Sequence, residues 1–154
     1  MKPPKEHQGF ARIIKEARDS RDYSILTNGI PYASLIGMQC MPMGDDVLFT
    51  LPNQMTNIGN PILPAIHGGV IGGFMEMSAA LHLMLFMDEL RLPKIIDFSI
   101  DYLRSGQSKD TYAHCEVCRQ GARVANVAVT AWQSKKELPI AIARGHFKLS
   151  KGRS

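Results

Sequence analysis

Apolar residues follow two different periods along the chain, and the longest helical period lies in its middle. There they recur at spacings of four, three, four and three residues, at Val70, Phe74, Met77, Leu81 and Met84. This spacing places them on one face of an α-helix. We expect a long helix that starts near His67-Gly68-Gly69 and ends at Pro93.

After this helix the period changes to two, which is typical of a strand with one buried face. The apolar positions are Ile96, Phe98, Ile100 and Tyr102, and polar residues lie between them. Further strands are expected at 110–118, 122–133 and 139–149, and a hairpin before the helix at 34–42 and 46–51. The proline-rich residues 52–66 predict a loop.

The first part of the chain predicts a short amphipathic helix, followed by a turn. Phe10, Ile13, Ile14 and Ala17 fall on one helix face, and Asn28-Gly29 with Pro31 mark the turn. We therefore expect residues 1–33 to form a helical extension that packs on one domain, residues 34–150.

The order of elements indicates an α+β fold, because few strands alternate with helices. One long helix packed against one curved, mainly antiparallel sheet of about six strands is the simplest arrangement. The run 62–87 is apolar enough to raise the question of a membrane span, but it contains His67, Glu76 and His82. A charge at the centre of a spanning helix is costly, so we expect a buried core helix and no membrane partner.

Composition restricts the function only a little. The chain has 154 residues, a formal net charge of +4 and 45% hydrophobic residues, as expected for one globular domain. Its three cysteines, Cys40, Cys115 and Cys118, do not indicate a secreted disulfide framework, and the N-terminus lacks an apolar signal core, so a cytoplasmic location is expected. No zinc-ligand spacing and no basic stripe with aromatics is present, so neither a metal nor a nucleic-acid partner is expected.

His67-Gly68-Gly69 at the helix start is a candidate oxyanion site. The first N–H groups of a helix have no internal acceptor and lie at the positive end of its dipole. Glycine there allows a ligand to approach the backbone. The alternative is a glycine-rich loop that serves only close packing.

Glu76 is the second candidate. Its neighbours one turn away are Gly72, Gly73, Ala79 and Ala80, so this face is close to another backbone or to a ligand. A carboxylate on such a face is costly unless it is paired or used. The alternative is a structural glutamate.

The spacing of Gly68 and Glu76 along the helix decides whether one chain can bring both to the same ligand. Gly68 and Glu76 are eight residues apart, which is roughly 12 Å along one helix. One helix can hardly present both to the same carbonyl group, whereas two antiparallel copies can. If both residues are functional, the site lies between subunits.

The segment HGGVIGGFME resembles the signature of hotdog-fold thioesterases of the phenylacetate-pathway (PaaI-like) type, within the 4-hydroxybenzoyl-CoA thioesterase superfamily. The later segments FSIDYLRSG and GARVANVAVTAWQSKKELPIAIARGHFKL resemble strands of the same family. The resemblance implies a long helix wrapped by a curved antiparallel sheet, assembly into homodimers or homotetramers, and hydrolysis of acyl-CoA thioesters without metal or cofactor.

The resemblance also implies residue roles. Gly68 N–H would polarise the thioester carbonyl with Gly69 nearby, and Glu76 of the partner chain would act as base or nucleophile. His67 and, by its place before the His, Asn60 would complete the catalytic set. The candidates for contacts to the CoA phosphates are Arg104, Gly121 and Arg123. The alternatives are a hotdog hydratase or dehydratase and a non-catalytic acyl-CoA-binding protein.

Overall fold

The computed structural model describes residues 5–151 and shows a layered arrangement around one central helix. The helices are α1 (Lys5–Ser20), α2 (Ser24–Gly29), α3 (Pro31–Ile36) and α4 (Gly68–Phe86), with a 3₁₀ turn η1 (Met55–Asn57). The strands are β1 (Gln39–Met43), β2 (Asp46–Leu51), β3 (Ile58–Asn60), β4 (Ala65–Ile66), β5 (Arg91–Tyr102), β6 (Thr111–Gln120), β7 (Val124–Trp132) and β8 (Ala141–Lys151).

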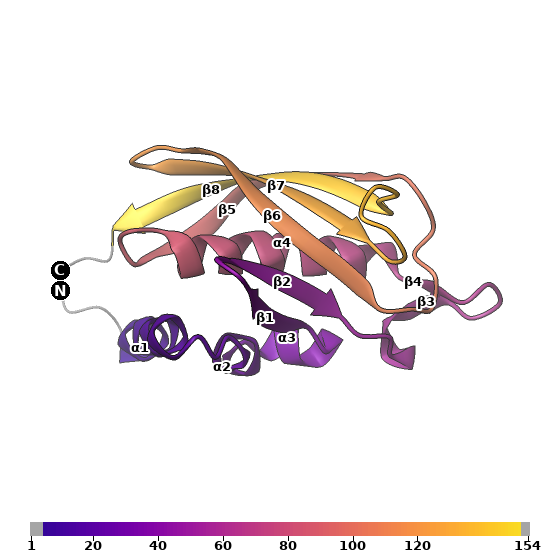
Figure 1. The fold of residues 1–154 in the computed structure, drawn as a ribbon, viewed down its shortest axis with the longest axis horizontal. Coiled ribbons are helices and arrows are strands. Elements are labelled where there is room, and N and C mark those ends of the chain that lie inside the picture. Colours follow the sequence, from indigo (N-terminus) through magenta and orange to yellow (C-terminus); the bar gives the residue numbers. More distant parts are fainter. Residues whose placement is uncertain (1–4, 152–154) are drawn as a thin grey trace.

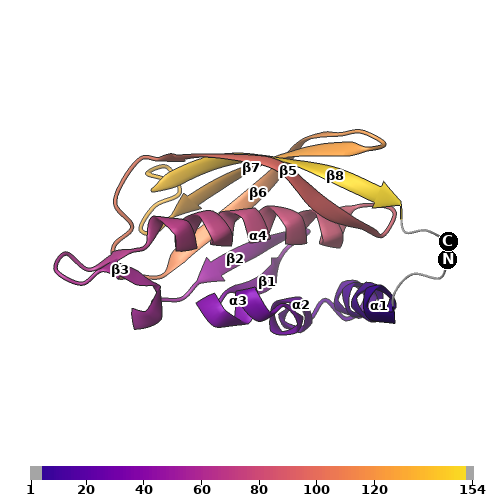
Figure 2. The ribbon, with the colours of Figure 1, turned by 180° about the vertical axis from the view of Figure 1, so that it is seen from behind.

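Six strands form one sheet in the order β1-β2-β6-β7-β8-β5, and each neighbouring pair is antiparallel. The sheet covers one side of α4, and α1 to α3 form a row on the other side (Figure 1). The same layers are seen from behind in Figure 2. The α+β class, the long central helix and the antiparallel hotdog sheet are therefore confirmed.

Helix α4 is the centre of the hydrophobic core. Phe74, Met75 and Leu81 are fully buried. By length and composition α4 is apolar enough to cross a membrane. It lies between the sheet and the other helices with 56% of its apolar window buried, and a core helix meets the same criteria. The predicted buried face needs a correction, because Val70 and Met77 are only partly buried.

The predicted end of this helix was wrong. Helix α4 ends at Phe86, and Pro93 lies inside β5. Proline is tolerated there because β5 is the last strand of the sheet and, within the described part of the chain, pairs with β8 alone, so a missing N–H interrupts no second ladder.

The expected burial of β5 also needs a correction. Phe98 and Ile100 are partly buried as predicted, but the side chains of Ile96 and Tyr102 are 55% and 52% exposed. The pairing with β8 shifts between Ile95 and Asp97, and among residues 5–151 no strand pairs with the outer edge of β5. The alternation of apolar and polar residues therefore predicted the strand correctly, but it predicted the buried face of the strand only in part.

The N-terminal segment is more helical than expected. The amphipathic helix is confirmed, with Ile14 and Ala17 buried, but the turn predicted near Asn28 is a pair of short helices. Pro31 occupies the first turn of α3, where its missing N–H costs nothing. The predicted strand 34–42 starts later, at Gln39, because α3 extends to Ile36.

The segment 52–66, predicted as a loop, contains η1 and the small β3–β4 hairpin. The remaining strands lie close to their predicted positions. The fold thus places the start of α4 directly after the β3–β4 hairpin and beside the end of β5.

Candidate functional site

The start of α4 is held by the segment that precedes it. The N–H of His67 donates to the carbonyl oxygen of Asn57 at 2.9 Å, and the side chain of Asn57 donates to Ile36 O at 2.8 Å. Gly59 packs so closely that a Cβ there would lie 2.8 Å from His67 Cβ. These contacts fix the position at which the helix begins.

Nearly all backbone groups of the first helical turn are engaged. His67 is the N-cap residue, and its Nδ1 accepts the N–H of Gly69 at 2.9 Å. The N–H groups of Val70 and Ile71 donate to His67 O. Within residues 5–151 no acceptor is found for the N–H of Gly68, which has no partner inside the helix either. Of the two predicted glycines, Gly68 therefore carries the available donor.

A cavity of about 310 Å³ adjoins this donor. Its wall is made by the helix start, the end of β5 and the loop that follows, with Ile66, Gly68, Ile71, Tyr102, Leu103, Arg104, Ser105 and Gly106. The hydroxyl of Tyr102 donates to Gly68 O at 2.7 Å. A ligand in this cavity would meet a helix N-terminus, a phenol and a guanidinium.

Glu76 lies two turns further along α4, on a face of small residues. Its side chain is half-buried, and no hydrogen bond or ion pair to it is found among the described residues. Gly72, Gly73 and Ala80 are its neighbours on the same partly exposed strip. The carboxylate is thus neither solvated on a polar face nor used as a structural partner within the chain.

Two tyrosines border this strip. Tyr102 Oη lies 3.4 Å from the place of a Cβ on Gly72, and Tyr32 Oη occupies the place that a Cβ on Gly73 would need. With about 100° between successive residues of a helix, Glu76 points between these two directions. Glu76 therefore lies on a strip of small residues between the two tyrosines.

Asn60, predicted beside the carbonyl, lies in β3 with an exposed side chain. Its Oδ1 accepts from the N–H groups of Ile62 (3.0 Å) and Leu63 (3.2 Å) and so shapes the β3–β4 turn. Its amide nitrogen is the group left for a ligand. The role of Asn60 stays a prediction.

The predicted phosphate contacts are divided between the two ends of the sheet. Arg104 lines the cavity and is held by a bond from Nη1 to Pro139 O at 2.7 Å. Arg123 and Gly121 precede β7, whose first residue pairs with Lys148, whereas Tyr102 pairs with Ala141 at the other end of β8. Within one chain, the structure brings Arg104 but not Arg123 to Gly68.

Sequence reasoning missed Tyr102, Tyr32 and Asn57. Tyr102 was assigned to the apolar face of a strand, although its place at the strand end, just before Leu103-Arg104, was a signal for a polar role. The contacts of Tyr32 and Asn57 depend on how the N-terminal extension and the pre-helix loop fold back. No hydrophobic periodicity in the sequence indicates these contacts.

In the part of the chain that the structure describes, no group of three His, Cys, Asp or Glu side chains could hold a metal ion. Burial raises the pKa of Cys40 to about 12 and that of Cys115 well above its usual value, while Cys118 is exposed.

Known proteins resemble this chain in sequence and in fold. A family model described as thioesterase superfamily matches residues 63–140. The medium/long-chain acyl-CoA thioesterase YigI of Escherichia coli is 34% identical over 108 residues, which are 62% of this chain and 69% of that protein. A crystal structure of a Chromobacterium violaceum protein is 39% identical, with a TM-score of 0.75 over 91% of this chain and 98% of that one. The BH2602 protein of Bacillus halodurans, solved with CoA, shares the fold at 16% identity, with a TM-score of 0.71 over 91% of this chain and 93% of that one.

Proposed function

The chain belongs to the thioesterase superfamily and is a thioester hydrolase of the hotdog fold, and from this premise we propose that it cleaves medium- or long-chain acyl-CoA at a site built by two subunits. The acyl length is carried over from the Escherichia coli relative. The observation that carries the site is the N–H of Gly68, for which no acceptor is found in residues 5–151, on a residue that lines a cavity at the positive end of a long helix.

The Gly68 N–H is the proposed oxyanion donor. A thioester carbonyl gains negative charge on oxygen when it is attacked, and a fixed N–H at a helix N-terminus stabilises that charge more than it stabilises the ground state. His67 contributes as the N-cap acceptor of the Gly69 N–H, which keeps the first turn closed around Gly68.

Glu76 is the proposed carboxylate, and it comes from the partner chain. The partly exposed strip of Gly72, Gly73, Glu76 and Ala80 allows close approach of a second α4, and the free edge of β5 lies beside it. An antiparallel pair of β5 strands would extend the sheet and align the two helices. Each Glu76 would then lie near the other chain's Gly68.

Two routes fit these groups. As a base, Glu76 takes a proton from water, whose oxygen attacks the carbonyl carbon. The tetrahedral oxyanion then collapses, breaks the C–S bond and releases CoA thiolate, which recovers the proton. As a nucleophile, Glu76 attacks the carbonyl carbon itself, the C–S bond breaks, and CoA thiolate leaves a mixed anhydride behind. Water then hydrolyses the anhydride, which frees the acid and the Glu76 carboxylate, and the thiolate takes up the proton released.

Arg104 is the proposed CoA contact in the chain that supplies Gly68, since it lines the same cavity. A guanidinium with one N–H committed to Pro139 O keeps further donors for a phosphate. Arg123 and Gly121 can serve this site only from another subunit, because they lie at the far end of their own sheet.

The donor is tested by comparing Gly68→Pro with Gly68→Ala. Proline removes the N–H but suits the first helical position, and the extended conformation of His67 (φ −59°, ψ 129°) accepts a following proline. Alanine keeps the N–H, and its Cβ would lie in ordinary contact, 3.5 Å from the Tyr102 ring. We expect kcat to fall by about 10²–10³-fold for proline and little for alanine. Equal activity of the two folded variants would contradict the proposal.

The shared site is tested by mixing subunits. Glu76→Ala alone should reduce turnover by roughly two to four orders of magnitude. A mixed dimer of Gly68→Pro and Glu76→Ala carries one intact site and one doubly damaged site. With random reassortment, activity should return to about a quarter of wild type. Verified mixed dimers without recovery would place both groups in one chain or remove one of them from the mechanism.

A further inference from the structure

The oxyanion donor lies on the most flexible kind of backbone. Gly68 and Gly69 open the helix, and glycine restricts neither of its backbone torsions. An N–H on such a segment stabilises a transition state only if the peptide planes on both sides of Gly68 are held by other groups.

Apart from the regular bonds inside α4, four hydrogen bonds hold these two planes. The plane between His67 and Gly68 is fixed at its oxygen, which accepts from Val70 N–H (2.9 Å) and Ile71 N–H (3.2 Å). The plane between Gly68 and Gly69 is fixed at its N–H by His67 Nδ1 (2.9 Å) and at its oxygen by the Tyr102 hydroxyl (2.7 Å). The first three bonds join residues 67–71 to one another, and the fourth comes from a different element.

Tyr102 is suited to act as that external anchor. It is the last residue of β5 and pairs with Ala141. The next two N–H groups, of Leu103 and Arg104, both donate to Ile140 O, at 2.8 and 3.1 Å. The hydroxyl therefore ties the helix start to the rigid end of the sheet, while the ring forms part of the cavity wall.

We infer that Tyr102 is a positioning residue whose hydroxyl holds the Gly68–Gly69 peptide so that the Gly68 N–H points at the reacting carbonyl. This inference rests on the proposed function. Tyr102→Phe keeps the ring and removes only the hydroxyl. One hydrogen bond of this kind corresponds to about three- to tenfold in rate. We expect kcat and kcat/KM to fall together by that factor with KM unchanged, because the bond matters when charge develops.

The control is Tyr112→Phe, the same change on β6, where no hydrogen bond to the hydroxyl is found among residues 5–151. It should leave kcat, KM and the thermal midpoint unchanged. A purely structural role of Tyr102 would lower the midpoint of Tyr102→Phe without lowering kcat, and a substrate-contact role would raise KM. Either result overturns the inference.

A double mutant separates this inference from the function on which it rests. If Tyr102 acts through the Gly68 N–H, Tyr102→Phe should cause no further loss in the Gly68→Pro background, where that N–H is absent. A full additional three- to tenfold loss there overturns the positioning role but not the donor. Wild-type activity of Gly68→Pro instead overturns the donor, and the positioning role with it.

Discussion

At the scale of single residues, the environment assigns different chemistry to side chains of one type. His67 is an acceptor that caps α4, His146 is paired with Asp97 at 2.7 Å, and the Nδ1 of His82 is buried with no hydrogen-bond partner in the described chain. The cysteines differ in the same way. Burial keeps the thiols of Cys40 and Cys115 protonated and inaccessible, whereas Cys118 is exposed.

Thiol labelling should reflect that difference. In the native protein a maleimide should label Cys118 rapidly, while Cys40 and Cys115 react only after denaturation, since the reactive species is an accessible thiolate. Mass spectrometry of labelled peptides measures this. Rapid native labelling of Cys115 would contradict the burial of that strand.

The buried His82 should make the protein sensitive to acid. Burial lowers the pKa of His82 from the ordinary value of 6.5. The charge of Asp46 raises this pKa and that of His114 lowers it, and burial is the largest of the three effects. Below pH 6.5 the unfolded chain binds a proton on His82 that the folded chain does not bind. The stability that comes from keeping His82 neutral is therefore fully present above pH 6.5 and is lost as the pH falls through the pKa of the folded state. We expect the thermal midpoint to fall on acidification from pH 7.5 to 5.5, and less in His82→Gln. Equal slopes in both proteins would argue against the assignment.

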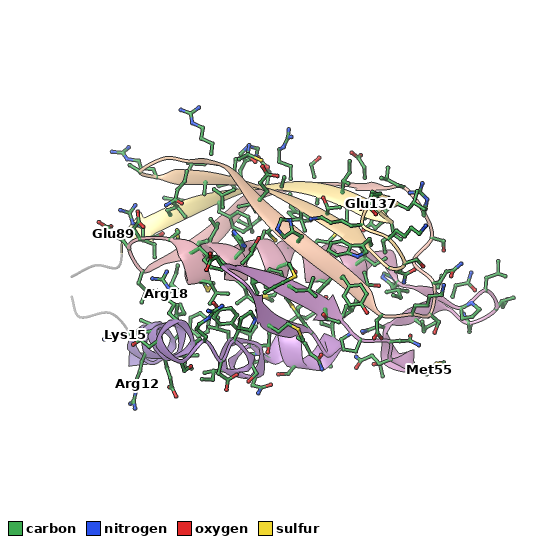
Figure 3. All side chains as sticks on the ribbon, viewed as in Figure 1. Arg12, Lys15, Arg18, Met55, Glu89 and Glu137 are labelled. Atoms are coloured by element: carbon green, nitrogen blue, oxygen red, sulfur yellow. The ribbon has the colours of Figure 1, made fainter. Side chains whose placement is uncertain are left out.

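At the scale of elements, α4 is fixed at both ends by other parts of the chain. Its start is held by Asn57 and Tyr102, and its end by α1, where Arg18 Nε and Nη2 donate to Met84 O (2.7 Å) and Met87 O (2.8 Å). Figure 3 shows Arg18 on α1 near the end of α4. A cation at a helix C-terminus also complements the helix dipole.

Replacing Arg18 should therefore weaken the whole domain. We expect Arg18→Leu to lower the free energy of unfolding by about 2 kcal/mol, the usual scale for hydrogen bonds from a charged donor. Arg12→Leu, on the exposed side of α1, serves as the matched control and should change little. Urea denaturation measures both, and equal stability of the two variants would show that α1 packs without fixing α4.

The elements also show how far the sequence alone could lead. The 3.6 and 2.0 periods predicted α4 and the strands because they follow from the burial of one face. The helix end and the face of β5 were mispredicted because Pro93 and Ile96 lie on a strand edge, whose surroundings the periods do not record. Gly68 and Glu76 stood out by type and spacing. Tyr102 was marked only by its place before Leu103-Arg104, and its bond to Gly68 O became visible only when β5 and α4 were placed side by side.

At the scale of the whole molecule, one chain has surfaces that suit a second copy. The edge of β5 exposes Ile95 and Ile96, and the strip with Glu76 lies alongside. Long apolar edge strands are usually covered in native proteins. The proposed two-subunit site and the covering of this edge therefore depend on the same assembly.

A charge on that edge should abolish assembly and activity together. We expect wild type to be at least a dimer by light scattering at micromolar concentration, and Ile96→Lys to be a folded monomer with little thioesterase activity. Leu138→Lys, an equally exposed leucine in the β7–β8 connection, is the matched control and should stay oligomeric and active. An active Ile96→Lys monomer would show that one chain holds a complete site.

The mainly apolar character of α4 has a consequence for biosynthesis. The strands β5 to β8 that cover it are translated after it, and β8 ends 65 residues beyond Phe86. At typical elongation rates the ribosome needs on the order of several seconds for that length. During this interval the nascent chain exposes a long apolar segment, so its exposure to non-native contacts depends on how quickly the last strands emerge and cover it.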